Sequence, residues 1–167
     1  CSENKRVDMS QFCIYIDVEP YLAQWFINSH GGSTPVELER ASVESKILEV
    51  FLTKQPPERE PEVFEKQKVA IYIPTFRNRP AAVYNYLPRR AQAALLLSIR
   101  NRFDVQLWND LHHFGAIGQR QDELIYAWME KTGIELSEEN WNSIAKRYQR
   151  QRKIYQINNY RKLKKFD

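Results

Sequence analysis

The C-terminal part of the chain holds the residues whose types and spacing best indicate a chemistry, which is the binding of negative charge. Residues 140–166 contain nine Lys or Arg and no Asp or Glu. If this segment is a helix, its cations gather on one side, opposite an apolar arc. Neutralising phosphates releases their condensed counterions, so such a side can bind nucleic acid. The predicted phosphate-binding residues of this helix are Lys146, Arg147, Arg150, Lys153, Arg161 and Lys164.

Aromatic and apolar residues interrupt this basic side. Tyr155 and Tyr160 lie among the charges, where an aromatic ring can stack on a base. Ile154 and Ile157 also fall on the basic side, which indicates either a kink near residues 158–159 or contact with a partner. The alternative interpretation is a solvated face on a frayed, Lys-rich terminus.

A second acid-free segment lies earlier in the chain. Residues 66–103 contain eight Lys or Arg and no Asp or Glu, and their further candidates for phosphate contact are Arg77, Arg79, Arg89 and Arg90. Arg in the first turn of a helix is unfavourable beside the positive end of the dipole, which favours an anionic partner there. Pairing with the acidic residues of the preceding segment, from Glu58 to Glu65, is the alternative.

Charge is therefore segregated along the chain. Residues 66–103 and 140–167 each carry a net charge of +8, and the remaining residues together carry −12. Segregated charge produces directional electric fields, which steer charged partners.

Catalytic and metal-binding signals are weak. The sequence has no Gly-rich phosphate loop, nucleophile elbow or Cys/His metal spacing, so no catalytic residue, metal or cofactor is predicted. His112 and His113 are adjacent, and on a helix we expect their side chains to diverge by about 100°. One set of carboxylates could in principle form a magnesium-dependent nuclease site, although nothing in its spacing specifies this: Asp17, Glu19, Asp104 and Asp110.

The N-terminal half combines strand and helix signals. Alternating apolar residues predict two strands, over residues 12–18 and 69–73, that pair into a small sheet. A helix is expected from Pro20 to the glycines after His30. Thr34, Pro35 and Glu37 form a capping-box pattern, which predicts a helix over residues 35–54.

The C-terminal half looks helical. One helix is expected to start at Pro88, and Asp104 is expected to cap the start of the next. Gly133 should end a further helix, and Ser137 should begin the last one. The predicted fold class is α+β and mostly helical, with a small two-stranded N-terminal sheet packed on helices, followed by a C-terminal helical bundle. We expect a flexible lead-in over 1–10, one compact domain over 11–155 that divides into 11–87 and 88–155, and a basic extension over 156–167.

Composition bounds the cellular setting. No apolar run approaches the roughly 18 residues that span a bilayer, and no N-terminal signal region is present. The two cysteines, Cys1 and Cys13, form no disulfide framework. A cytoplasmic location is expected, without membrane attachment unless Cys1 is the lipidated residue of a mature lipoprotein.

Four stretches resemble an uncharacterised family of bacterial proteins, some of them encoded in phage-like regions: YLAQWF, SVESKILEVFL, NRFDVQLWNDLHHFG and NWNSIAKRYQRQR. The resemblance covers most of the chain. It implies a bacterial cytoplasmic setting, and it implies no activity and no catalytic residues.

The sequence favours a non-enzymatic protein that binds nucleic acid, DNA or RNA, or is accessory to such binding, through its C-terminal basic amphipathic helix. A protein-interaction module is the alternative, in which the same helix docks an acidic protein or a second copy of the chain in a homo-oligomer. A small metal-dependent nuclease or hydrolase is the second alternative.

Overall fold

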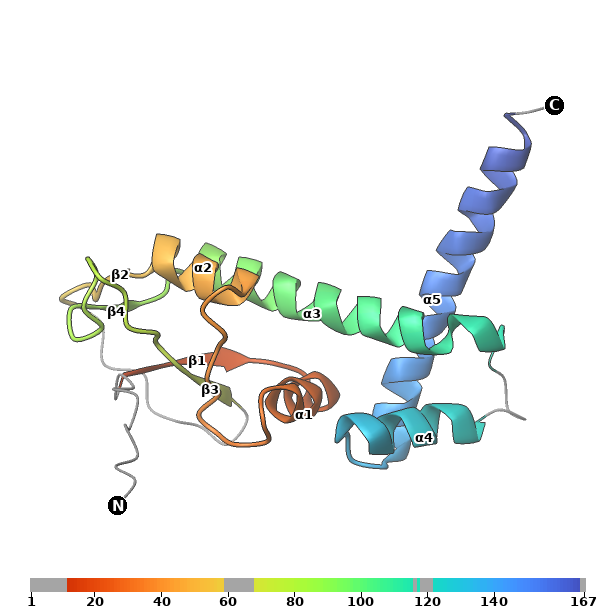
Figure 1. The fold of residues 1–167 in the computed structure, drawn as a ribbon, viewed down its shortest axis with the longest axis horizontal. Helices are drawn as coiled ribbons and strands as arrows, with labels where there is room; N and C mark the ends of the chain where they lie inside the picture. Colours follow the sequence, from red (N-terminus) through yellow and green to blue (C-terminus); the bar gives the residue numbers. More distant parts are fainter. Residues whose placement is uncertain (1–11, 59–67, 116, 118–121, 166–167) are drawn as a thin grey trace, which may run out of the picture. The chain divides into compact units, whose positions relative to one another are not determined.

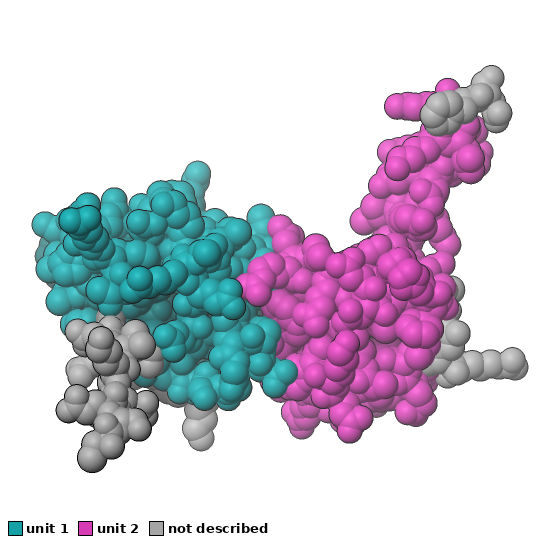
Figure 2. All heavy atoms as spheres, in the orientation of Figure 1, with its two compact units in different colours: residues 1–19, 26–99 teal, residues 20–25, 100–167 magenta. Residues whose placement is uncertain are grey.

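The chain divides into two compact units (Figure 2). A computed structural model describes residues 12–58, 68–115, 117 and 122–165, so the expected lead-in over 1–10 lies outside the described residues. Unit 1 comprises residues 1–19 and 26–99, and unit 2 comprises residues 20–25 and 100–167. Along the chain the two units meet after residues 19, 25 and 99. Both α1 (Pro20–Ser29) and α3 (Arg89–Leu111) contribute residues to each unit.

Unit 1 is built on the predicted two-stranded sheet (Figure 1). Strand β1 (Cys13–Asp17) pairs antiparallel with β3 (Lys68–Tyr72), and Ile14 lies opposite Ile71. Ile14 and Ile16 are buried, as alternation predicts for a strand with one covered face. The Cys13 thiol is partly buried, and this burial raises its pKa above the ordinary value.

The first helix after the glycines begins later than predicted. Residues 35–42 are not helical, and α2 runs over Val43–Phe51. The capping-box prediction is wrong because Val36 joins the sheet instead. Its N–H donates to the carbonyl oxygen of Ala70 at 2.8 Å, and its own carbonyl accepts from the N–H of Tyr72 at 2.9 Å. Val36 is fully buried there, so a contact distant in sequence overrides the local capping signal.

Ser42, not Thr34, caps α2. The Ser42 hydroxyl oxygen accepts a hydrogen bond from the N–H of Ser45 at 3.1 Å. We expect Ser42→Ala to lower the free energy of unfolding by about 1 kcal/mol, because it removes that acceptor. Thr34→Ala is the matched control and should change it much less. Thermal unfolding followed by circular dichroism measures both, and an equal effect of the two changes would contradict this assignment.

A second small sheet was not predicted from the sequence. Strands β2 (Thr53–Lys54) and β4 (Tyr84–Tyr86) pair antiparallel with an irregular register. Strand β4 lies between β3 and α3, where the sequence predicted no strand. These strands are too short to show the alternating pattern that identified β1 and β3.

Helix α3 is continuous through the position where a new helix was expected. Asp104 lies inside α3 and caps no helix, so that prediction is wrong. No Gly or Pro interrupts residues 89–111, and the buried residues recur at every fourth position: Ala91, Leu95, Ile99, Phe103, Leu107 and Leu111. This unbroken apolar spacing extends the helix past Asp104, whose carboxylate finds a tertiary partner instead.

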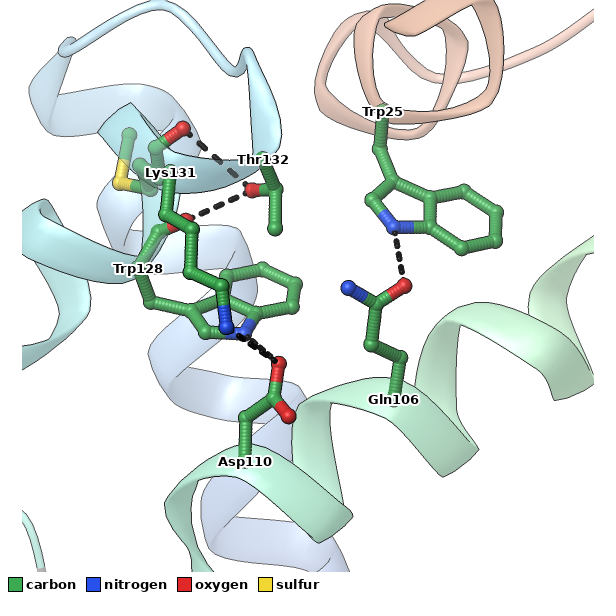
Figure 3. Close-up of polar contacts among 7 residues, drawn as sticks. Trp25, Gln106, Asp110, Trp128, Lys131 and Thr132 are labelled. Carbon is green, nitrogen blue, oxygen red and sulfur yellow. Dashed lines mark hydrogen bonds and ion pairs between the residues drawn. The ribbon is translucent and has the colours of Figure 1, made fainter. Parts of the chain in front are cut away.

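Unit 2 packs helices around Phe103. Its ring lies edge-on to Tyr21 and Trp25 of α1 and to Trp128 of α4 (Asp122–Thr132), with centroids 5.3 to 5.4 Å apart. One and two turns further along α3, the side chains of Gln106 and Asp110 accept hydrogen bonds from the indole nitrogens of Trp25 and Trp128, respectively (Figure 3).

The last two helices of unit 2 follow the prediction, whereas the 3-10 helix before them was not predicted. The short 3-10 helix η1 (His112–Phe114) continues from α3. Gly133 follows α4 with a φ of 76°, a left-handed conformation that favours glycine. Helix α5 (Glu138–Leu163) starts after Ser137, whose hydroxyl accepts from the N–H of Asn140. The α+β, mostly helical fold class is thus confirmed.

Candidate nucleic-acid interface

The first half of α5 is anchored in unit 2. Ile144, Ala145 and Tyr148 are buried along one face. The Tyr148 hydroxyl lies 3.1 Å from the carbonyl oxygen of Leu111 and 2.6 Å from that of Gly115. This face of the helix therefore belongs to the core of unit 2 and is not available to a ligand.

An ion pair fixes α5 to α3. The Nε and Nη2 atoms of Arg147 each donate to the Asp104 carboxylate at 2.8 Å, and the two side chains are 22% and 28% exposed. The side-chain hydrogen bond to Asp104 raises the pKa of the Arg147 guanidinium and outweighs burial, which lowers it. Gln151, one turn further along, donates to the Asp104 carbonyl oxygen at 2.8 Å. We call these three residues the anchor.

Arg147 should consequently act on stability and not on ligand binding. Arg147→Ala should lower the free energy of unfolding of unit 2 by about 1–3 kcal/mol, because the half-buried Asp104 loses both donors. Tryptophan fluorescence during urea unfolding reports this unit, since Trp25, Trp108, Trp128 and Trp141 all belong to it. This role would be contradicted if Arg147→Ala left the stability unchanged and its nucleic-acid affinity depended less on salt than that of the unaltered protein. Arg147 would then contact the ligand.

Aromatic rings continue the contact between α3 and α5 for one more turn. Trp108 lies 5.3 Å from Tyr155, and it stacks on His112 at 5.4 Å. The rings of His112 and His113 lie 3.8 Å apart, so the expectation that they diverge was wrong. Both residues lie in η1 and not in an α-helix, and His112 is turned toward Trp108, with its Nδ1 2.8 Å from the Trp108 carbonyl oxygen.

Beyond Tyr155 the helix stands clear of the rest of unit 2 (Figure 2). None of residues 156–165 is buried, and all of them except Asn159 are exposed. We call this segment the arm. The helix passes through residues 158–159 without interruption, so the irregularity suggested by Ile154 and Ile157 is not a break in the helix.

A row of cations follows the outer side of α5 from the anchored half into the arm. Lys146, Arg150, Lys153, Arg161 and Lys164 are all exposed. Together with Ile157 they recur at intervals of three or four residues, which puts them within about 40° of the direction opposite Tyr148. We call these five cations the basic stripe. Five of the six predicted cations of this helix therefore share one exposed side, and Arg147 faces α3.

The two predicted stacking residues differ in their surroundings. Tyr155 is 51% exposed and contacts Trp108 with one side of its ring. Tyr160 lies in the arm and is 60% exposed, with the Nζ atom of Lys164 5.0 Å from the centre of its ring. Tyr160 thus offers the more accessible ring face.

The four candidate arginines of the other basic segment all belong to unit 1. Arg77, Arg89 and Arg90 are exposed. Arg79 is engaged within the unit, because its Nη1 atom donates to the carbonyl oxygens of Val50 and Leu52 at the end of α2. A cation at this position also stabilises the negative end of the helix dipole. Its guanidinium lies over the ring of Tyr84 as well.

The carboxylates considered for a nuclease site have other surroundings. Asp17 and Glu19 belong to unit 1, and Asp104 and Asp110 belong to unit 2. Asp104 binds Arg147, while Asp110 accepts from Trp128 and lies 3.9 Å from Lys131. Among the described residues, no three His, Cys, Asp or Glu side chains are grouped so that they could hold a metal ion.

Sequence reasoning missed the anchor because its central residue, Asp104, has the residue type of a helix cap. Arg147 and Gln151 are four residues apart and therefore on one side of a helix, which was a readable signal for a shared partner. The identity of that partner, 43 residues earlier, was not readable.

Comparison of the chain with family models, with curated proteins and with solved structures gives no match. The described helices include none that is both long and apolar enough to cross a bilayer.

Proposed function

We propose that the protein binds nucleic acid through the basic stripe and the arm of α5. The observation that carries this proposal is the exposure of a cationic side on a helix that has no acidic residue from Asn140 to Lys165. Cations without neighbouring carboxylates are available to phosphates, and the counterions they displace supply the binding free energy.

The residues differ in the part they play in this proposal. The basic stripe contacts phosphates, and Tyr160 supplies a ring on which an unpaired base can stack. Arg147 and Arg79 are excluded from the ligand contacts because both bind groups of the protein itself. Arg77, Arg89 and Arg90 of unit 1 form a second and independent candidate contact.

Fluorescence anisotropy with labelled duplex and single-stranded oligonucleotides tests this proposal between about 50 and 300 mM salt. We expect binding at micromolar concentration or tighter, with an affinity that falls linearly and steeply on logarithmic axes. Absence of binding at the lowest salt would contradict it and would favour the protein-docking alternative. The observation in favour of that alternative is the exposure of Ile154, Ile157 and Leu163 at 59%, 42% and 70%.

A further inference from the structure

The arm has properties that select one kind of nucleic acid, and the inference drawn from them rests on the proposed function. We propose that the end of α5 enters the major groove of double-stranded DNA, with Ile157 toward the bases and the basic stripe toward the phosphates. Three features support this proposal. The arm is not packed against the rest of the unit, cations flank the apolar residue Ile157 on both sides around the helix axis, and Ile154 and Ile157 are exposed.

Exposure on every side is the first feature that suits the arm to the major groove. An α-helix with its side chains is about 10–12 Å across, and the major groove of B-form DNA is about 12 Å wide and 8.5 Å deep. A helix that packs on its own domain presents only its outer face to this groove, as recognition helices do. The arm can enter it, because no residue from 156 to 165 is buried. The major groove of duplex RNA is deep and narrow and does not admit such an element.

Charge on both sides is the second feature, because a phosphate backbone runs along each wall of the groove. Around the helix axis, Lys153 and Lys164 fall to one side of Ile157, and Arg150 and Arg161 fall to the other. Each wall therefore faces two cations about three helical turns apart, one from the arm and one from the one or two turns that precede it.

The exposed isoleucines are the third feature, and the major groove gives them a contact. Each thymine presents its C5-methyl group there, which is an apolar surface amid hydrogen-bonding groups. Ile157 lies in the middle of the basic stripe, and Ile154 lies one turn before it on the Arg161 side. Two copies of the chain cannot readily pair through this same surface, because like charges would face one another.

One substitution tests whether binding depends on the helical shape of the arm or only on its charges. Asn158→Pro leaves every charge in place but removes a helical N–H and clashes with the carbonyl of residue 154, so the helix is kinked or broken within the arm. Asn158→Ala is the matched control. Asn158 is exposed and lies beyond the contact of Tyr155 with Trp108. Tryptophan fluorescence verifies that unit 2 stays folded in both variants.

Anisotropy is measured with duplex DNA, duplex RNA and single strands of equal length. We expect the unaltered protein to bind duplex DNA at least about tenfold more tightly than the other two, since the helix fits that groove alone. Asn158→Pro should reduce affinity for duplex DNA to the single-strand level, and Asn158→Ala should not. Bound protein should also shield guanine N7, a major-groove atom, from methylation by dimethyl sulfate.

The contrary results are distinguishable. Equal binding of all three nucleic acids by the unaltered protein and by Asn158→Pro would overturn this inference and leave the proposed function standing. Tighter binding of duplex RNA or of single strands would do the same. Failure to bind any nucleic acid would overturn both, and binding of an acidic helical peptide in its place would assign the arm to a protein partner.

Discussion

The Arg150→Ala, Lys153→Ala double variant should bind duplex DNA about 10- to 100-fold more weakly than the unaltered protein at moderate salt. Both cations belong to the exposed basic stripe, beside the point where α5 leaves unit 2. Each phosphate contact contributes about 0.9 to the slope of log affinity against log salt concentration, so the slope should become shallower by about 1.8.

The control for this variant removes the same charges elsewhere. Arg40 and Lys46 are exposed residues of unit 1, outside both acid-free segments. Arg40→Ala, Lys46→Ala lowers the net charge equally and should leave the slope unchanged, apart from a small loss of affinity through the overall field. Equal losses in the two double variants would show that net charge, and not the basic stripe, determines binding. Folding should be unaffected, because neither side chain of the stripe is buried.

The largest effect on stability is expected from Phe103→Ala. Phe103 is fully buried and contacts three aromatic rings within unit 2, from Tyr21, Trp25 and Trp128. Its removal should lower the free energy of unfolding by about 3–5 kcal/mol, through the lost transfer free energy and the cavity left behind. The neighbouring rings are large and mutually packed, so they cannot collapse into the space without losing their own contacts.

Val105→Ala is the matched control, since Val105 lies two residues away on the same helix and is 59% exposed. Its free energy of unfolding should change by less than about 0.5 kcal/mol. Urea unfolding followed by tryptophan fluorescence measures both variants, because Trp25 and Trp128 adjoin the altered ring. A loss below 1 kcal/mol for Phe103→Ala, on the order of an ordinary surface change, would contradict the packing described here.

The elements that the sequence predicted well are those whose signal is repeated along the element. Strands β1 and β3 each show alternation over five residues, and the start of α5 combines the Ser137 cap with acidic residues in the first turn. Repetition makes such patterns robust, because one contrary residue does not erase them.

The errors occurred where a single local signal competed with a distant partner. The capping box at Thr34 was overridden by hydrogen bonds between Val36 and β3, and Asp104 was taken for a cap although Arg147 binds it. Both partners lie more than thirty residues away, so no local window contains the deciding contact.

The same limit applied to the candidate site. Residue type identifies a cation but does not reveal whether the protein itself occupies it. Arg147 and Arg150 are nearly equivalent in the sequence, yet one binds Asp104 and the other is exposed. A basic extension was predicted from residue 156 with a kink near residues 158–159 left open, and in the structure it is the continuation of α5, which runs to Leu163.

The arm is held at one end only, where Tyr155 contacts Trp108. From Tyr155 to Lys165 the helical rise amounts to about 15 Å, so a tilt of the arm by about 10° displaces its tip by about 3 Å. Residues at or before the fixed end of the arm, such as Arg150, hardly move under such a tilt, whereas Lys164, near the tip, moves by a few ångströms. Contacts that require fixed geometry, such as that of Ile157 with the bases, therefore belong at the start of the arm, and the tip is suited to charge attraction that tolerates motion. Along its length, α5 would thus pass from contacts of defined geometry to attraction by charge alone.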